Sequence, residues 1–595
     1  MSTAWDSTHR LSRPWRGGPW SFELRDDEIA DISYDGRIVL RAARAVVRDR
    51  NWDTAPLIVD RVRETDATVT LHVRSVGLGS SFRGVMRVEA RGSRFVVIAD
   101  LESEHPFDTN RTGLVVLHPP ALAGATLEVV HPEGDVESTA FPRAISPHQP
   151  VRGISALAWE HDGLRVRMSF EGDVFEMEDQ RNWTDASFKT YSRPLALPFP
   201  YPLDAGDQVR QTLEIDVEPT DATAPAPAAE RIDLVAGGAF PSLAVAASTA
   251  PDPAPPFDPT ASAVLVELDL ATRNWRAALR RAASSGLPLD VRFVLADDDA
   301  LTTGVAALRG HDVVRVTAFP PEGASRHVSD ASAIAALRSA LAHAGVSTEV
   351  VGGARSHFTE LNREHHRLPR DLDGIVFSVT PLFHSLGTEQ LVESLAMQRL
   401  VAEQGVVIAA AVSDAARGET DPSGTGVPVH IGPIGLRPHF NDVATIPPPR
   451  PAADDLRDGY GPALLELTDP RQDAEQLAAW TIASAAALAV PGVATLTFFE
   501  EWGPRGIRDE SGAERPVAAA MRALAELSGR ASLHGASPDG LVWAIGARSD
   551  DGAERVLVSN MDSVGRTLRI TTPTGHAGVH LGPLTWLHVD LPARG

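Results

Sequence analysis

Between residues 243 and 499, short apolar segments alternate with segments of helical periodicity, and this rhythm restricts the region to folds with a parallel sheet. The predicted strands are Leu243–Ala247, Val264–Leu268, Asp290–Leu295, Val313–Ala318, Thr348–Val351, Ile375–Val379, Val406–Val412 and Ala494–Phe499. The predicted helices between them include Trp275–Ser284, Ala331–Ala344, Thr388–Glu403 and Ala474–Ala489. Eight β/α units over roughly 300 residues favour a (β/α)8 TIM-like barrel. A doubly wound open sheet is the alternative, but it favours a Gly-rich turn after its first strand, and the sequence has none there.

The regions on either side of this alternation are rich in β-formers. Residues 20–217 contain segments such as Thr68–Arg74, Arg94–Ala99 and Leu164–Phe170, separated by Gly, Pro and Asp, which predicts an antiparallel β-sandwich. From about Ser532 a second series predicts a small β-domain, with strands at Leu541–Ala547, Arg555–Ser559, Arg566–Ile570 and Trp586–Leu591.

The length of 595 residues predicts two to four domains, because one hydrophobic core rarely grows past about 250–300 residues. We assign residues 1–217 to an N-terminal β-sandwich domain and 231–530 to the barrel. Residues 531–595 form the C-terminal β-domain. The Pro- and Ala-rich stretch 218–230 has the composition of a linker.

The amino-acid composition excludes several classes of binding partner and several kinds of active-site chemistry. The net charge of −24 argues against nucleic acid and anionic membranes as partners, because both repel an acidic protein. The absence of cysteine excludes disulfides, thiolate metal sites and cysteine nucleophiles. We see no long apolar run that could span a membrane and no apolar h-region in Met1–Trp20, so we expect a cytoplasmic protein. With nucleic acid and membranes disfavoured, we expect its partner to be a small molecule. The oligomeric state stays open.

Three clusters follow predicted barrel strands, at the end where barrel enzymes carry their active sites. Glu360 and Asn362 follow the fifth strand and place a proton shuttle beside an amide donor. His384 follows the sixth strand and suits proton transfer, although a core histidine is the alternative. The last strand ends in Glu500, Glu501 and Trp502. Because side chains alternate along a strand, we expect Glu501 to face the site and Glu500 to pair with an arginine outside it, with Trp502 stacking on a sugar.

A fourth cluster lies in the N-terminal region, in the run Phe175–Tyr191. This is the densest mixture of polar and aromatic residues in the chain, and such mixtures are typical of sugar-binding sites, although a solvated hairpin is the alternative. The candidate substrate-binding residues are Glu178, Asp179, Arg181, Asn182, Trp183, Asp185 and Lys189.

Other chemistries have weaker sequence signals. Glu364–His366 and His439–Asn441 lack the spacing of a strong metal motif, so we predict neither metal nor cofactor. The chain has no GxSxG motif, which disfavours a serine hydrolase of the α/β type.

Several of these segments together resemble the D-apionate lactonase family. The resemblance covers about residues 100–506 and is carried by FEMEDQRNWTDASFKTY (175–191), TELNR (359–363), VTPLFHS (379–385) and GLRPHFNDVAT (435–445), with Asn110–Pro119, Phe141-Pro142 and Ile145–Pro147. It implies an N-terminal domain, a TIM barrel and a C-terminal domain, and hydrolysis of the lactone of D-apionate, a branched sugar acid, in apiose catabolism.

The chain departs from the family pattern at two strand ends. It has Pro381–Gly387 (PLFHSLG) where the family suggests PQVHAFD, and Phe499–Trp502 (FEEW) where the family suggests YET. Changes at these positions suggest that the substrate could be a related lactone or a glycoside.

Two enzyme hypotheses and one binding hypothesis follow. A lactonase would use Glu501 or Glu360 as base for water, with His384, Asn362 or Arg181 polarising the carbonyl. A retaining glycosidase would use Glu360 as acid/base and Glu501 as nucleophile. A carbohydrate-binding protein would keep Trp183 and Trp502 without converging carboxylates.

Overall fold

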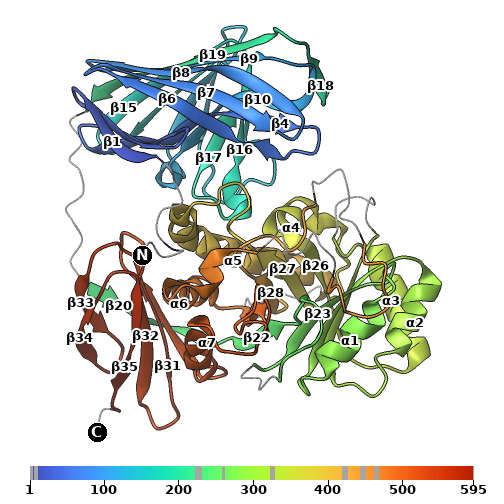
Figure 1. Cartoon of the computed structure of the whole chain (residues 1–595). Coiled ribbons are helices and arrows are strands. Elements are labelled where there is room, and N and C mark those ends of the chain that lie inside the picture. The colour runs from blue at the N-terminus through green and yellow to red at the C-terminus, as the bar shows by residue number, and fades with distance from the viewer. Residues whose placement is uncertain are drawn as a thin grey trace.

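The computed structural model describes residues 5, 11–220, 231–256, 261–321, 328–417, 426–442, 450–460 and 468–593, and the side chains of these residues except 414–417. Most of the predicted linker, 221–230, and the last three residues of the motif at 435–445 lie outside the described residues. The protein has a β-sheet domain at the top of Figure 1, a barrel below it and a smaller β-domain beside the barrel. The fold class predicted from the sequence is therefore confirmed.

The N-terminal domain consists of two large sheets. The first has the strand order β1 (Ser12–Gly17), β2 (Trp20–Arg25), β3 (Glu28–Tyr34), β4 (Arg37–Asp49), β10 (Phe107–His118), β17 (Phe188–Tyr191), β16 (Phe175–Asp179) and β13 (Val151–Ile154), with β5 (Thr54–Ala55) and β18 (Tyr201–Leu203) at its side. The second has the order β12 (Val136–Ala140), β11 (Thr126–Val130), β14 (Ala156–His161), β15 (Leu164–Glu171), β19 (Gln208–Pro219), β9 (Arg94–Ser103), β8 (Ser80–Arg91), β7 (Thr68–Gly77) and β6 (Leu57–Glu64). Side chains of both sheets share one apolar core, in which Trp20 packs on Phe95 at 4.8 Å between ring centroids.

The barrel is closed by eight parallel strands. They are β22 (Ser242–Ala246), β23 (Val264–Asp269), β24 (Leu289–Val294), β25 (Val313–Phe319), β26 (Glu349–His357), β27 (Gly374–Val379), β28 (Val429–Ile434) and β29 (Val493–Glu500). The helices of the barrel region are α1 (Trp275–Ala283), α2 (Asp298–Ala306), α3 (Ala331–Ala344), α4 (Phe358–Glu364), α5 (Thr388–Arg417), α6 (Gln476–Leu488) and α7 (Val517–Ala525). All residues of β24 and β27 are buried, as expected for strands between a packed interior and a ring of helices.

Local sequence signals set the limits of helix α3. The Asp330 side chain accepts a hydrogen bond from the amide of Ala333 and caps the first turn. Gly345 follows the last turn with φ +66°, a conformation that costs glycine little. The predicted helix Ala331–Ala344 is therefore confirmed at both ends.

The predicted strand Val406–Val412 is wrong, because helix α5 continues through it to Arg417 and the seventh barrel strand is β28. Gly405 suggests a break before an apolar, β-branched run, but it serves close packing instead: a Cβ at this position would lie 2.9 Å from the ring of Phe377. A short apolar run cannot by itself distinguish a strand from a buried helix.

By length and composition, residues 388–413 of α5 form the one helix, within the described part of the chain, that is long and apolar enough to cross a membrane. This helix nevertheless packs inside the protein. Glu393 pairs with Arg41 of the N-terminal domain, and Gln404 bonds to Ile145 of the same domain. We therefore assign α5 as a barrel helix that also forms part of the interface with the N-terminal domain.

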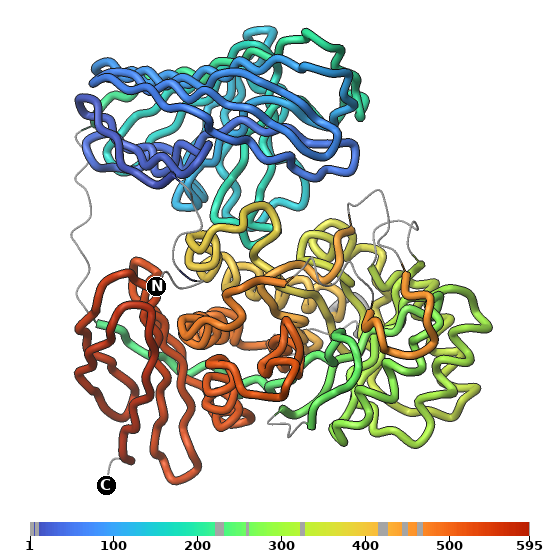
Figure 2. The backbone as a smooth tube through the Cα atoms, viewed as in Figure 1, coloured from blue at the N-terminus to red at the C-terminus, as the bar shows by residue number. Residues whose placement is uncertain are grey.

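The C-terminal β-domain takes in two strands that precede the barrel. Strands β20 (Arg231–Asp233), β33 (Arg566–Thr571) and β34 (His576–Leu581) form one sheet. Strands β21 (Val235–Ala239), β30 (Ala531–Ala536), β31 (Val542–Arg548), β32 (Glu554–Asn560) and β35 (Thr585–Leu591) form the other. Residues 231–239, which the sequence assigns to the barrel, therefore pair with the C-terminal strands, and Figure 2 shows this green segment running beside the red ones.

Candidate functional site

The run Phe175–Tyr191 connects the N-terminal domain to the barrel. Strands β16 and β17 pair as a hairpin, and the 3-10 helix η2 (Gln180–Trp183) lies at its tip. In Figure 1 this tip hangs from the N-terminal domain towards α4 and α5. The polar residues of the run therefore lie at a domain interface, on the side where the barrel strands end.

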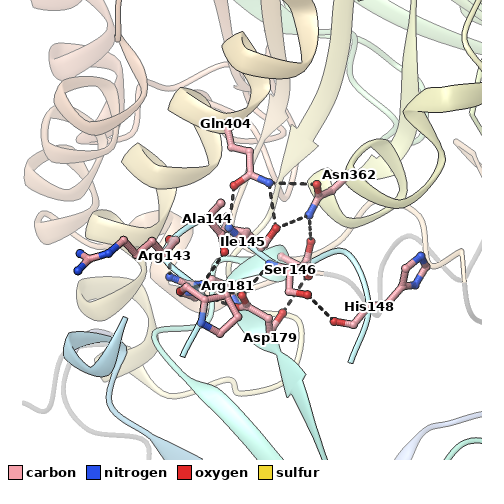
Figure 3. A network of polar contacts seen from close by, with 11 residues as sticks. Arg143, Ala144, Ile145, Ser146, His148, Asp179, Arg181, Asn362 and Gln404 are labelled. Carbon is pink, nitrogen blue, oxygen red and sulfur yellow. Dashed lines mark hydrogen bonds and ion pairs between the residues drawn. The ribbon is translucent and has the colours of Figure 1, made fainter. Parts of the chain in front are cut away.

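Asp179 and Arg181, two predicted substrate ligands, are internal supports of this tip. The Asp179 carboxylate caps η2 and pairs with the Arg181 guanidinium, with 2.6 Å between Oδ2 and Nη2. Arg181 also donates hydrogen bonds to the carbonyls of Pro142, Arg143 and Ala144 (Figure 3). Both side chains are at most 1% exposed, so neither has a free face for a substrate.

Asn182 and Asn362, also predicted to bind substrate, join the two domains. The Asn362 amide donates to Asn182 Oδ1 at 2.9 Å and to the carbonyl of Ile145 at 3.1 Å. Gln404 donates to Asn362 Oδ1 and to the same carbonyl, and accepts from the Ile145 amide (Figure 3). Their amide groups are used in holding residues 145 and 182 against α4 and α5.

Asp185 and His384 meet across the same interface. The Asp185 carboxylate lies 2.6 Å from His384 Nδ1 and also accepts a hydrogen bond from Gln390 at 2.9 Å. Trp183 and Phe383 pack edge-on against the imidazole, at 5.1 and 4.7 Å between ring centroids. Burial lowers the pKa of His384 by more than Asp185 raises it, so the imidazole is neutral near pH 7.

This histidine lines an interdomain cavity between the face of the first N-terminal sheet and the start of α5. The cavity has an inner part of about 60 Å³ and an outer part of about 280 Å³, and His384, Ser385 and Gln390 line both parts. The inner part has more cationic than anionic side chains in its lining: Arg41, Arg44, Arg48, Arg111 and Lys189 against Glu28 and Asp185. The outer part is lined by carboxylates as well as arginines, among them Asp26, Asp27, Glu28 and Glu389.

Lys189, which lines the inner part of this cavity, forms an ion pair with Glu178. Lys189 Nζ lies 2.5 Å from Glu178 Oε2, and Arg363 of α4 lies 3.5 Å from the other oxygen of that carboxylate. Burial opposes ionisation of Glu178, but these cations outweigh it and lower its pKa to about 2, while burial lowers the pKa of Lys189 to about 8. The pair is therefore ionised at neutral pH, and Lys189 brings positive charge to the cavity that contains His384.

A second cavity of about 120 Å³ lies at the carboxyl ends of the barrel strands, and Glu267 and Glu500 line it. Glu267 is buried, which alone would raise its pKa, but pairing with Arg355 at 2.7 Å holds the pKa below the ordinary value. Glu500 accepts hydrogen bonds from Arg505 and Thr249. Both carboxylates are thus paired with an arginine. The third carboxylate of the lining, Asp469, likewise pairs with Arg471 at 2.8 Å.

Glu500 faces the barrel cavity and Glu501 does not line it, the reverse of the orientation expected from the sequence. Phe499 has φ +51°, so the backbone leaves the extended conformation just before Glu500 and side-chain alternation fails there. The pairing of β29 with β22 also shifts register at Ala246. Glu500 does pair with an arginine, as predicted, but Arg505 is itself part of the cavity lining.

Glu501, Trp502 and Glu360 are all buried away from both cavities. Burial raises the pKa of Glu501 to about 8 against a hydrogen bond from the Ser248 amide, and Trp502 packs beneath Arg281. Glu360 accepts a hydrogen bond from Ser356, and burial, followed by the charge of Asp442, raises its pKa to about 7. The structure therefore brings His384, Asp185, Lys189 and Glu178 together, but it does not bring Glu360 and Glu501 to the same cavity.

Sequence reasoning missed the arginines of the N-terminal sheet. Arg44, Val46 and Arg48 alternate along β4 and line the inner cavity together, as Arg111, Val115 and Leu117 do along β10. The signal was present as arginines spaced by an even number within an otherwise apolar strand, which places them on one face. Within the described residues, no group of three His, Asp or Glu side chains is arranged to hold a metal ion.

The chain as a whole is a (β/α)8-barrel protein with β-domains on both sides and a polar, cationic cavity between the N-terminal domain and the barrel. Two models of one family match it: D-apionate lactonase, N-terminal domain, over residues 1–220, and D-apionate lactonase, TIM barrel domain, over residues 242–529. The chain therefore belongs to the D-apionate lactonase family.

A D-apionate lactonase of Brucella anthropi is 38% identical to this chain over 213 residues, which are 34% of this chain and 35% of that protein. The match thus spans about a third of the relative's length.

Three solved structures have a distant similarity to this chain. SrfJ from Salmonella typhimurium has a TM-score of 0.37 at 8% identity, covering 68% of this chain and 98% of that one. A GH30 endoxylanase from Clostridium papyrosolvens has a TM-score of 0.35 at 9% identity, covering 62% and 97%. A putative aldose 1-epimerase from Escherichia coli has a TM-score of 0.26 at 11% identity, covering 35% and 99%.

Proposed function

We propose that this protein hydrolyses a sugar-acid lactone, with D-apionolactone as the substrate that the family indicates, and that His384 and Asp185 form its reaction centre in the interdomain cavity. The observation that carries the proposal is the 2.6 Å contact between Asp185 Oδ2 and His384 Nδ1, in a cavity that Lys189 also lines. A base that activates water, a carboxylate that orients it and a positive charge that stabilises the oxyanion together suit ester hydrolysis.

The geometry assigns a role to each nitrogen of the imidazole. The Asp185 carboxylate accepts the hydrogen bond, so Nδ1 carries the proton and Nε2 is free to act as a base. Gln390 holds the other carboxylate oxygen, which fixes the orientation of the pair. The outer part of the cavity, about 280 Å³, is lined by His384 and offers room for one sugar lactone.

The reaction then proceeds in two proton transfers. A water oxygen adds to the lactone carbonyl carbon while its proton passes to His384 Nε2, and the positive charge of Lys189 offsets the oxyanion that forms. The ring C–O bond then breaks, and the imidazolium returns the proton to the departing alkoxide oxygen. The product is the open-chain hydroxy acid. No group other than water and the lactone is consumed.

The two hypotheses that place the chemistry at the barrel mouth have less support. Glu360 and Glu501 do not line the barrel cavity, and each of the carboxylates that do is bonded to an arginine; these are Glu267, Asp469 and Glu500. A retaining glycosidase needs two carboxyl groups about 5–5.5 Å apart on either side of the bond that it cleaves.

The function is tested by presenting the purified protein with D-apionolactone, a series of other aldonolactones and a panel of aryl furanosides. We expect acid release from one or more lactones, measured by a pH indicator, and no release of the aryl group. Turnover of the furanosides without turnover of any lactone would contradict the proposal.

A further inference from the structure

Two arginines beside the proposed reaction centre are placed against each other in the N-terminal sheet. Arg48 on β4 and Arg111 on β10 are direct cross-strand partners, and both line the inner part of the interdomain cavity with His384. Like charges opposite each other on one face of a sheet are destabilising. An anion bound between two guanidinium groups in this position would relieve the repulsion.

The neighbouring arginines have carboxylates in direct contact, whereas among the described residues Arg48 and Arg111 have none at ion-pair distance. The charge of Glu178 acts on Arg48 from farther away and only partly offsets that of Arg111. Arg41 pairs with Glu393 at 2.7 Å, and Arg44 pairs with Asp27 at 3.0 Å. Within the same described part of the chain, the Arg48 side chain makes no hydrogen bond or ion pair. Its guanidinium pKa is lowered to about 10, first by burial and then by the charge of Arg111.

Arg111 is held in position without being neutralised. Its Nη2 donates to the carbonyl of Arg193 at 2.8 Å, and its guanidinium lies over the rings of Tyr191, at 3.7 Å, and Trp52, at 5.3 Å. The side chain is only 5% exposed, and its Nε has no hydrogen-bond partner among the described residues. Stacking fixes the planar group while leaving its charge available to a ligand.

From these contacts we propose that Arg48 and Arg111 bind the carboxylate of a small hydroxy acid beside His384. The inference deepens the proposed function, on which it rests, by naming the chemical class of the ligand. Two sources supply such a group: a second carboxylate on the lactone substrate, or the carboxylate that ring opening creates. The inner cavity, about 60 Å³, suits a single small anionic group, and the wider outer part is left for the hydroxylated carbon chain. The guanidinium fork matches a carboxylate geometrically.

The binding test compares three ligands that have the same six-carbon skeleton: D-sorbitol, D-gluconate and D-glucarate. Calorimetry is done on the full chain carrying His384→Gln, so that binding is measured whether or not hydrolysis occurs. We expect at least tenfold tighter binding of one of the two acids than of sorbitol. Arg48→Gln and Arg111→Gln should each remove most of this difference. Arg457→Gln, at an exposed ion pair with Asp455, is the matched control and should leave it unchanged.

Folding of the variants is checked by urea unfolding in a buffer without carboxylates. Because Arg48→Gln relieves a like-charge contact, it should leave the midpoint unchanged or raise it. If Arg48→Gln does not fold, Arg48→Lys, which keeps the charge but loses the fork, should still weaken acid binding. Equal affinity for sorbitol and both acids, or unchanged acid binding in both arginine variants, would overturn the inference.

The source of the carboxylate is separated by kinetics on the chain with His384 intact. If the substrate supplies it, Arg48→Gln raises KM for an anionic glucarolactone but not for the neutral D-apionolactone. If ring opening supplies it, the variant leaves both KM values unchanged and weakens inhibition by the product acid. Acid binding without any lactone turnover would refute the proposed function while the anion site stands, so the two failures are distinguishable.

Discussion

The carboxylate of Asp185 and the imidazole of His384 are 199 residues apart in the sequence and 2.6 Å apart in space, one in the N-terminal β-domain and the other in the loop after barrel strand β27. This contact makes the proposed reaction centre a property of the docked domains. Neither domain alone holds both groups.

Asp185→Asn tests the orienting role of the carboxylate. An amide can offer its NH2 group to Nδ1, which favours the tautomer with the proton on Nε2 and removes the free base. We expect kcat for lactone hydrolysis to fall by about a hundredfold or more, with a smaller change in KM. Gln390→Glu is a useful companion, because it replaces a donor to the same carboxylate with a repelling charge. An unchanged kcat in Asp185→Asn would show that the pair is structural.

The pH dependence of kcat follows from the state of His384. Burial lowers the pKa of this histidine below its ordinary value, and the neutral form is the active base. Activity should therefore rise with pH along a single limb whose midpoint lies below about 6.5, and stay level above it. Rates measured across the mildly acidic to neutral range, in buffers of constant ionic strength, test this expectation. A midpoint on the alkaline side of neutrality would point to another base.

Asn362→Ala tests the docking contacts shown in Figure 3. The change removes hydrogen bonds to Asn182, Ile145 and Gln404, and it leaves buried polar groups of the partners unsatisfied. We expect a loss of about 1–3 kcal/mol in the free energy of unfolding and a lower kcat, because Asp185 depends on the docked hairpin. Chemical unfolding followed by tryptophan fluorescence, together with kcat, measures both effects. Arg94→Gln, in an exposed ion pair on the other sheet, is the control.

Glu501→Gln separates burial from catalysis. Since the folded state raises the pKa of Glu501 to about 8 and the unfolded value is about 4.5, the protonated carboxyl stabilises the fold fully below pH 4.5. This contribution is lost as pH rises towards 8. The glutamine cannot ionise, so the variant should not show this loss. Relative to wild type, its free energy of unfolding should be higher at pH 8 than at pH 4.5 by on the order of 2 kcal/mol or more, with kcat unchanged. Urea unfolding at the two pH values measures it. A hundredfold loss of kcat would contradict this expectation and indicate that the reaction takes place at the carboxyl ends of the barrel strands.

The sequence was sufficient for most of the fold, because strands buried on both faces and capped helices leave local signals. The barrel strand β27 and helix α3 lie where periodicity places them. Two predictions failed where tertiary contacts outweigh local pattern. Gly405 allows helix α5 to approach Phe377 instead of ending there, and the positive φ of Phe499, near the end of β29, reverses the expected orientation of the two glutamates that follow it.

The site was only half predictable for a related reason. His384, Asp185 and Lys189 stand out in the sequence as residue types that carry chemistry, but their convergence depends on how two domains dock. Asn362 and Arg181 stand out equally, and the structure uses them to hold that docking in place. The type of a residue indicates which chemistry its side chain can do. Whether the side chain can reach a substrate or instead holds the two domains together depends on contacts with residues far away in the sequence.

The most direct test of the reaction centre compares two variants in one assay, His384→Gln in the interdomain cavity and Glu500→Gln in the barrel cavity. With a lactone that the wild-type protein turns over, we predict that His384→Gln lowers kcat by at least about a hundredfold and that Glu500→Gln keeps kcat within a few fold of wild type. Loss of activity in Glu500→Gln together with full activity in His384→Gln would contradict the account and place the chemistry at the mouth of the barrel.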